Sequence, residues 1–150
     1  MKPFIVLIVV SILALIFLKI NTGDYNYALS ARIGMSAMLV FTALGHFMYA
    51  DGMALMVPDF IPFKKEVIIL TGILEALGAF ALHFSEFRVL VAWFLILFFI
   101  TILPSNIKAA VENINYQKGT YDGPGLLYLW FRVPLQICFI LWVYLSSIRV

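Results

Sequence analysis

The sequence predicts an all-α integral membrane protein that crosses the bilayer several times. Three observations predict this class: 64% of the 150 residues are hydrophobic, only 12% are charged, and the mean hydropathy is +1.05. The apolar residues fall into runs of about 20, the helix length needed to cross a bilayer, whereas a barrel strand needs only about 10. Helices also satisfy their own backbone hydrogen bonds in lipid. We therefore expect a polytopic helical bundle that forms a single transmembrane domain over residues 1–150.

Five apolar segments are long enough to cross a membrane. The expected four-helix core, residues 28–148, consists of segments 28–49, 66–84, 89–111 and 126–148. An extra N-terminal transmembrane helix is expected over residues 3–20. That run is longer than the roughly 7–15 apolar residues of a secretory signal and ends without a small-x-small cleavage site. We expect it to be retained and to pack outside the core, because it carries no internal charged side chain.

Alternating crossings distribute the basic residues over two sides of the membrane. Side A would hold Lys2, Lys64, Lys65, Lys108 and Lys118, and side B would hold Lys19, Arg32, Arg88 and Arg149. Basic residues accumulate on the cytoplasmic side, so five against four favours side A as cytoplasmic, in a bacterial inner membrane. Arg32, near side B, is expected to extend its charge to that interface. Two loops on side A, residues 50–65 and 112–125, either cover an opening between the helices or simply connect them.

Five polar side chains interrupt the apolar segments at similar depths. With about 1.5 Å of helical rise per residue, all five lie about 5–15 Å from side A. They are His46, Glu75, Asn106, Arg132 and Gln136. Ionisable groups are costly in hydrocarbon, so groups at one depth should face each other, a cavity or a ligand. Together with Tyr128, one helical turn before Arg132, they predict a ligand-binding pocket of six residues.

Neighbouring residues support this convergence. Glu75 shares a stripe with small residues, which is typical of close helix contacts, and an arginine fork binds a carboxylate through two bonds. We therefore expect an ion pair between Glu75 and Arg132. Pro104 and Pro134 each free a carbonyl one turn earlier, beside the polar residues, as a cavity lining requires. The alternative interpretation is that these residues only hold the helices together.

Several classes of site lack the residues that they need. Cys138 is the only cysteine, which excludes an intrachain disulfide and a CxxC pair. The second histidine, His83, lies near side B and cannot share a haem with His46. A metal held by His46, Glu75 and Asn106 would be poor in ligands. No nucleophile–base arrangement and no basic run for nucleic acid is present. We expect no catalytic residues, no bound metal and no self-contained enzymatic activity.

Six short motifs, four of which carry the five polar residues, follow one another along the chain. They are ARIG at 31–34 leading to GHF at 45–47, MVPDFIP at 56–62, LTGILE at 70–75, LPSNI at 103–107 and WFRVPLQ at 130–136. In this order the chain resembles the DoxX-like family of small membrane proteins over residues 28–148. The resemblance implies a four-helix membrane core and a role beside a membrane oxidoreductase. The family's functions are mixed, and it supplies no catalytic residue for this chain.

Three functions follow as expectations. The first is an accessory subunit that binds a quinone-like or lipid head group beside an oxidoreductase partner. In that role Arg132 and Gln136 donate to the ligand, Glu75 orients Arg132, and His46 carries a proton or donates a hydrogen bond. The second is a membrane scaffold or assembly factor whose polar cluster is structural. The third is a small-molecule permease.

Overall fold

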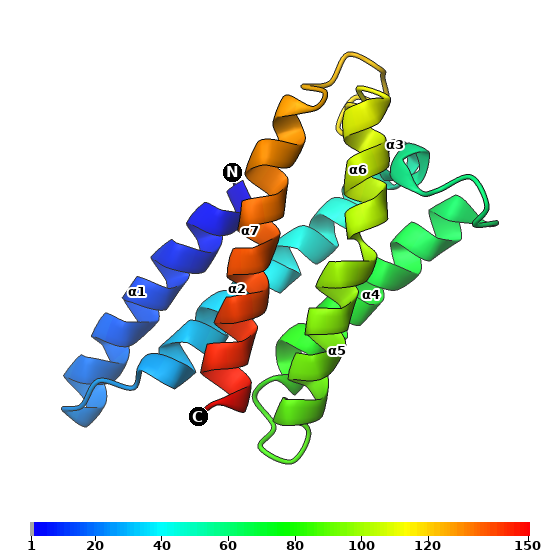
Figure 1. The fold of residues 1–150 in the computed structure, drawn as a ribbon. Helices are drawn as coiled ribbons and strands as arrows, with labels where there is room; N and C mark the ends of the chain where they lie inside the picture. Colours follow the sequence, from blue (N-terminus) through cyan, green and yellow to red (C-terminus); the bar gives the residue numbers. More distant parts are fainter. Residues whose placement is uncertain (1) are drawn as a thin grey trace.

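The structure, a computed structural model that describes residues 2–150, is helical (Figure 1), which confirms the predicted class. Its helices are α1 (Lys2–Thr22), α2 (Tyr27–Met48), α3 (Ala50–Met56), α4 (Lys64–Ala81), α5 (Arg88–Thr101), α6 (Leu103–Val111) and α7 (Leu127–Val143), followed by the π-helix η1 (Tyr144–Ile148). Within the described residues, strand-like pairing is limited to one isolated bridge between Asn115 and Thr120. Long apolar runs therefore fold as helices, as the sequence predicts.

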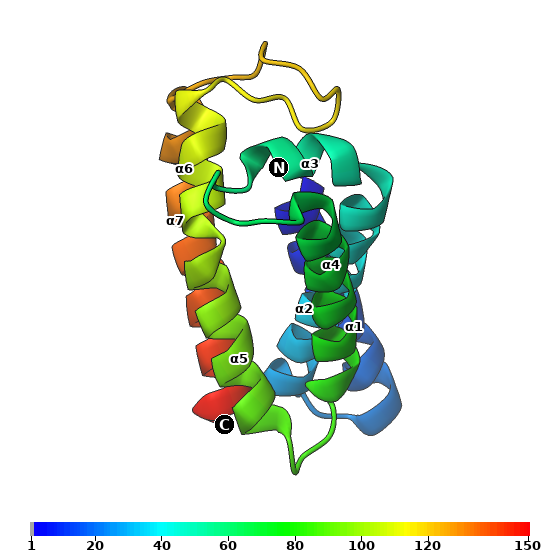
Figure 2. The same ribbon diagram turned by 90° about the vertical axis from the view of Figure 1, so that its right-hand side faces the viewer.

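The helices form two layers that run between the same two ends of the molecule. Figure 2 shows α1, α2 and α4 in one layer and α5, α6 and α7 in the other. The core between them is apolar and includes Met38 and Leu39 of α2, Leu95 of α5, and Phe139 and Val143 of α7. The chain passes from one layer to the other through the short loop after α4, at the side B end. Sides A and B therefore correspond to the two ends of this bundle.

Within residues 2–150, four helices are long and apolar enough to cross a membrane. They are α1, α2, the combined α5 and α6 (Arg88–Val111), and the combined α7 and η1 (Leu127–Ile148). The predicted segment 66–84 also forms a long helix, α4, which packs along α2. It is not one of these four, since its 18 residues include four charged ones, Lys64, Lys65, Glu66 and Glu75. The side chain of Glu75 is the one that faces inward, at 5% exposure.

The N-terminal helix α1 lies at the outer edge of its layer, against α2 (Figure 1). Leu7 of α1 is fully buried, and Ser11 is also buried, with its hydroxyl satisfied by donating to the Leu7 carbonyl at 2.7 Å. Gly34 of α2 faces this turn of α1 so closely that an added Cβ would overlap Ser11 Oγ and lie 2.7 Å from the Leu7 carbonyl oxygen. A glycine is thus required where the two helices meet.

The predicted single helix over 89–111 is divided into α5 and α6. Thr101 ends α5 and Leu103 begins α6, so Pro104 occupies one of the first positions of a new helix, where its missing N–H is tolerated. Pro134, by contrast, lies inside the continuous helix α7. Within this one layer, proline therefore begins a new helix at α6 and is accommodated inside the continuous helix α7.

Two loops, residues 50–65 and 112–125, lie together at the side A end. The first contains helix α3 before the irregular stretch around Pro58 and Pro62, so residues 50–56 are helical where a loop was expected. Gly52 of α3 lies directly beneath the carbonyl of Tyr116 in the second loop, and Tyr49 and Tyr116 form an edge-to-face pair at 6.0 Å. Figure 2 shows the two loops together over this end.

Asp59 joins the first loop to both layers. Its Oδ1 accepts from Lys64 Nζ of α4 at 2.6 Å and from Lys108 Nζ of α6 at 2.8 Å. Lys108 also donates to the Val57 carbonyl at 3.1 Å. The hydrogen bonds and charges of Lys108 and Lys64 lower the pKa of Asp59 to about 2. The loop is therefore held by an exposed, salt-sensitive contact.

An Asp59→Asn variant is expected to release residues 57–63 without unfolding the bundle. Because the folded-state pKa lies below the ordinary value of about 3.9, the wild-type contact is complete above that value and is lost as pH falls through about 2. Limited proteolysis at neutral pH should cleave this loop faster in the variant. Asp24→Asn is the control, because Asp24 is exposed and forms no ion pair within 4.0 Å among the described residues. Equal cleavage of Asp59→Asn and wild type would contradict this expectation.

Candidate functional site

The six predicted site residues lie on four helices and form three contacting groups. Glu75, Asn106 and Gln136 are buried, whereas the other three are half-buried. His46 of α2 contacts Glu75 of α4, Asn106 of α6 contacts Gln136 of α7, and Arg132 contacts Tyr128 within α7. The polar side chains of each group thus find partners from the same layer.

The His46–Glu75 group lies at a close contact between α2 and α4. An added Cβ on Gly72 of α4 would lie 2.7 Å from the Cβ of His46, so a glycine permits this approach. His46 Nδ1 lies 3.0 Å from the Ile68 carbonyl and 2.9 Å from the Thr71 hydroxyl, which itself donates to Ile68. A carbonyl oxygen only accepts, so Nδ1 carries the proton and Nε2 is directed at Glu75. The histidine ring is thereby fixed in orientation.

The Glu75 carboxyl is incompletely satisfied. Its Oε2 lies 3.6 Å from His46 Nε2, beyond hydrogen-bond distance, and contacts no donor among the described residues. The expected ion pair with Arg132 is not formed within 4.0 Å, so that prediction is wrong. The physical reason is the arrangement of helices: α4 packs on α2 and α5, whereas α7 packs on α5 and α6. Arg132 instead donates from Nε to the Tyr128 hydroxyl and lies over its ring, 5.1 Å from the centroid.

The Asn106–Gln136 group joins α6 and α7. Asn106 Nδ2 donates to Gln136 Oε1 at 3.3 Å, and Gln136 Nε2 donates to the Phe99 carbonyl. Phe99 adjoins Ile100, whose carbonyl loses its helical partner at Pro104. Gln136 thus uses both ends of its amide within the protein, beside the break between α5 and α6. These contacts fit the interpretation that this pair holds helices together.

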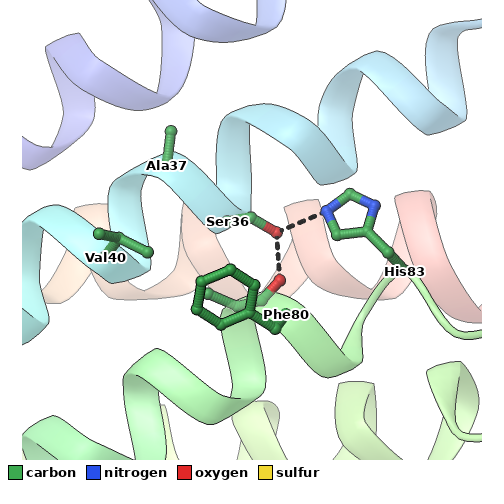
Figure 3. A pocket seen from close by; sticks show the side chains of 6 residues that line it. Ser36, Ala37, Val40, Phe80 and His83 are labelled. Carbon is green, nitrogen blue, oxygen red and sulfur yellow. Dashed lines mark hydrogen bonds between the residues drawn. The ribbon is translucent and has the colours of Figure 1, made fainter.

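Two hollows of the described structure lie away from these six residues. One, about 360 Å³, lies between α1 and α2 and includes Leu13 and Ile33. The other, about 450 Å³, lies between α2 and α4 and includes Ser36, Phe80 and His83 (Figure 3). Ser36 Oγ donates to the Ala79 carbonyl at 2.7 Å and lies 3.0 Å from His83 Nε2. Ser36, Phe80 and His83 are not among the six residues predicted from the sequence.

Arg32 is also placed differently from the prediction. It was expected to extend its charge to the side B interface, but it is only 8% exposed, and its Nη1 donates to the Ser146 carbonyl at 2.7 Å. Trp142 makes a parallel contact, donating to the Ala31 carbonyl at 3.0 Å. The four-residue spacing of Arg32 and Ser36 on α2 was the signal that could have revealed a polar face here.

Comparison with known proteins gives one family. A family model described as "Domain of unknown function (DUF8561)" matches residues 35–147. No curated protein and no solved structure matches the chain. The match corrects the expected resemblance to the DoxX-like family, for which no match was found. The motifs behind that resemblance are short, so they do not identify a family by themselves. The oxidoreductase partner rested on that resemblance and is not carried further.

Proposed function

The chain belongs to the DUF8561 family, and from its buried residues we propose that it is a non-enzymatic membrane protein that binds an amphipathic ligand. The ligand's polar head group would lie on the side A half of the bundle, against His46 and Glu75. A quinol-like or lipid head group that carries hydroxyl or amine donors fits this chemistry. One observation carries the proposal: Glu75 Oε2 is buried and forms no hydrogen bond that meets the distance and angle criteria within residues 2–150.

A buried acceptor without a donor costs about 1–3 kcal/mol, and more when it is charged. Residues that served only to hold helices together would satisfy each other, as Asn106 and Gln136 do. When Glu75 is ionised and His46 is neutral, their facing atoms are both acceptors. The pair therefore offers hydrogen-bond acceptors to a ligand that brings donors of its own.

Arg132 complements this pair. The described structure gives it one hydrogen bond, from Nε to Tyr128, so its remaining guanidinium N–H groups are free to donate to a ligand oxygen. Gln136, which the sequence analysis assigned the same role, already uses its amide within the protein. We therefore assign ligand contact to His46, Glu75, Arg132 and Tyr128, and structural support to Asn106 and Gln136.

Native mass spectrometry of the gently extracted protein tests this proposal. The wild type is expected to retain a small molecule, whereas Glu75→Gln, which replaces one acceptor oxygen by a donor, should bind it about tenfold more weakly or lose it. Glu66→Gln is the matched control, because Glu66 is an exposed acid on the same helix. Circular dichroism must show that both variants keep the wild-type helix content.

Two outcomes would contradict the proposal. If Glu75→Gln retained the same molecule at wild-type occupancy, the carboxylate would not contact it. If the wild type carried a stoichiometric second protein and no small molecule, the scaffold role would be supported instead. The Asn106–Gln136 contacts favour that alternative, since they hold helices without offering a free group. Solute flux into reconstituted vesicles would identify the third role, a permease.

A further inference from the structure

The segment between α3 and α4, residues 57–63, carries the two most exposed phenylalanines of the described part of the chain. Phe60 is 84% exposed and Phe63 is 75% exposed, so neither ring packs against the bundle. Figure 1 shows this segment extending sideways from α3, beyond the start of α4. Each ring leaves a large apolar area unburied, which is unfavourable in water. The surroundings of the segment therefore decide what these two rings contact.

Phe63 also has a strained backbone. Its φ of 52° and ψ of 47° are left-handed, a conformation that a bulky residue rarely adopts and glycine adopts readily. Such strain persists only where the neighbouring structure fixes it. Here Pro62 has a fixed φ, and Asp59 ties the segment to Lys64 and Lys108. Because the Phe63 ring is mostly exposed, contacts within the protein do not account for a phenylalanine at this position.

The outer face of α4 shows which surroundings the rings meet. Along this face, four exposed apolar residues follow at intervals of three and four: Leu70, Ile73, Leu77 and Phe80. A helix that faced water would carry polar residues on its exposed side. An apolar outer stripe on a helix packed beside membrane-spanning helices faces lipid. Phe63 directly precedes α4, so the two rings lie where this stripe ends at side A.

The side A end also has the residue types of a membrane interface. Two spanning helices meet this end, since α6 ends at Val111 and α7 begins at Leu127. Trp130, in the first turn of α7, is 81% exposed, and Lys64 and Lys65 directly follow the 57–63 segment. Exposed aromatic rings and basic side chains are typical of the level at which lipid head groups lie. The segment is therefore at head-group depth.

We propose that residues 57–63 form an anchor that inserts Phe60 and Phe63 into the head-group region of the side A leaflet. The ion pairs of Asp59 hold the segment in place before contact, so little conformational freedom is lost on insertion. Apolar contact with the bilayer offsets the strained backbone of Phe63. The anchor keeps the charged start of α4, Lys64 to Glu66, level with the head groups.

Spin labels on the full-length protein, in nanodiscs of phosphatidylcholine and phosphatidylglycerol, test this proposal. Phe60→Cys, Phe63→Cys, Leu77→Cys and Gln117→Cys are made separately in a Cys138→Ser background and carry a nitroxide. Collisions with oxygen, which concentrates in lipid, are compared with collisions with a water-soluble nickel chelate. Leu77 is the lipid reference, and Gln117, an exposed residue of the second side A loop, is the water reference. Labels at positions 60 and 63 are expected to collide more with oxygen than with the chelate, as at Leu77.

A matched pair of variants tests the contribution of the Phe63 ring. With the label at position 60, Phe63→Ser is expected to increase collisions with the chelate, whereas Phe63→Trp, which keeps an aromatic ring, should leave them unchanged. Labels at positions 60 and 63 that behave like Gln117 would place the segment in water and overturn the proposal. Labels shielded from both reagents would show that protein covers the segment, and the lipid assignment would be wrong.

Discussion

Replacing Gly34 by alanine is expected to weaken the attachment of α1 to α2 and to lower the free energy of unfolding by about 1–3 kcal/mol. The new Cβ would overlap Ser11 Oγ and lie 2.7 Å from the Leu7 carbonyl oxygen. The Ser11 hydroxyl can rotate away only by giving up its bond to Leu7, and the carbonyl belongs to a helix backbone that cannot yield locally. The two helices must therefore separate. Thermal unfolding in detergent, followed by circular dichroism, measures the loss.

Gly45→Ala is the matched control, because Gly45 lies on the same helix. The nearest atom to its added Cβ is Met53 Cε at 3.8 Å, an ordinary contact. Alanine favours a helix over glycine by about 1 kcal/mol, so this variant is expected to stabilise the protein. The two substitutions therefore differ in sign although their chemistry is identical. A stabilising effect of Gly34→Ala would show that α1 does not approach α2 at this position.

Gln136→Leu is expected to lower the free energy of unfolding by about 1–3 kcal/mol, because it leaves buried polar groups without partners. The Phe99 carbonyl would lose its donor and the Asn106 amide its acceptor, both beside the break between α5 and α6. Leucine has a similar volume, so little of the loss would come from an altered fit. Chemical unfolding in mixed micelles measures this change.

A double-mutant cycle with Asn106→Leu isolates the contribution of the pair. The double variant removes both amides, so it should cost less than the sum of the single variants. Hydrogen bonds between membrane helices contribute about 0.6 kcal/mol on average, and a coupling of that order is expected. Strict additivity would mean that the two side chains act independently and would contradict their contact at 3.3 Å.

Much of the fold could be predicted because the bilayer imposes a length and a composition on each helix. The features that were missed depend on local chemistry within such segments. Helix α3 is only seven residues long. A pattern of apolar residues on one helix face is hard to recognise over so few residues, so the sequence predicts a loop there. The division of segment 89–111 at Ile102 could not be predicted either. A proline such as Pro104 is compatible both with a kink in one helix and with the start of a new helix.

The polar residues of the candidate site could be found from the sequence, but their partners could not. Depth along a helix follows from counting residues, so His46 and Glu75 were correctly expected in the same half of the bundle. Which helices are neighbours does not follow from counting. Arg132 was paired with Glu75 by charge alone, although their helices belong to different layers, and Arg32 was assigned to the interface although Ser146, 114 residues away, buries it.

The two layers also have a consequence for how the protein is made. Because the chain crosses between them once, after α4, the ribosome completes the layer of α1, α2 and α4 before it begins the other (Figure 2). During that interval the face that carries Glu75 has only lipid or the insertion machinery as a neighbour. When α5, α6 and α7 are inserted, they pack against a surface of the first layer whose polar groups lipid solvates poorly. Biogenesis is therefore expected to proceed as the joining of two halves of one nascent chain, and not as the addition of single helices.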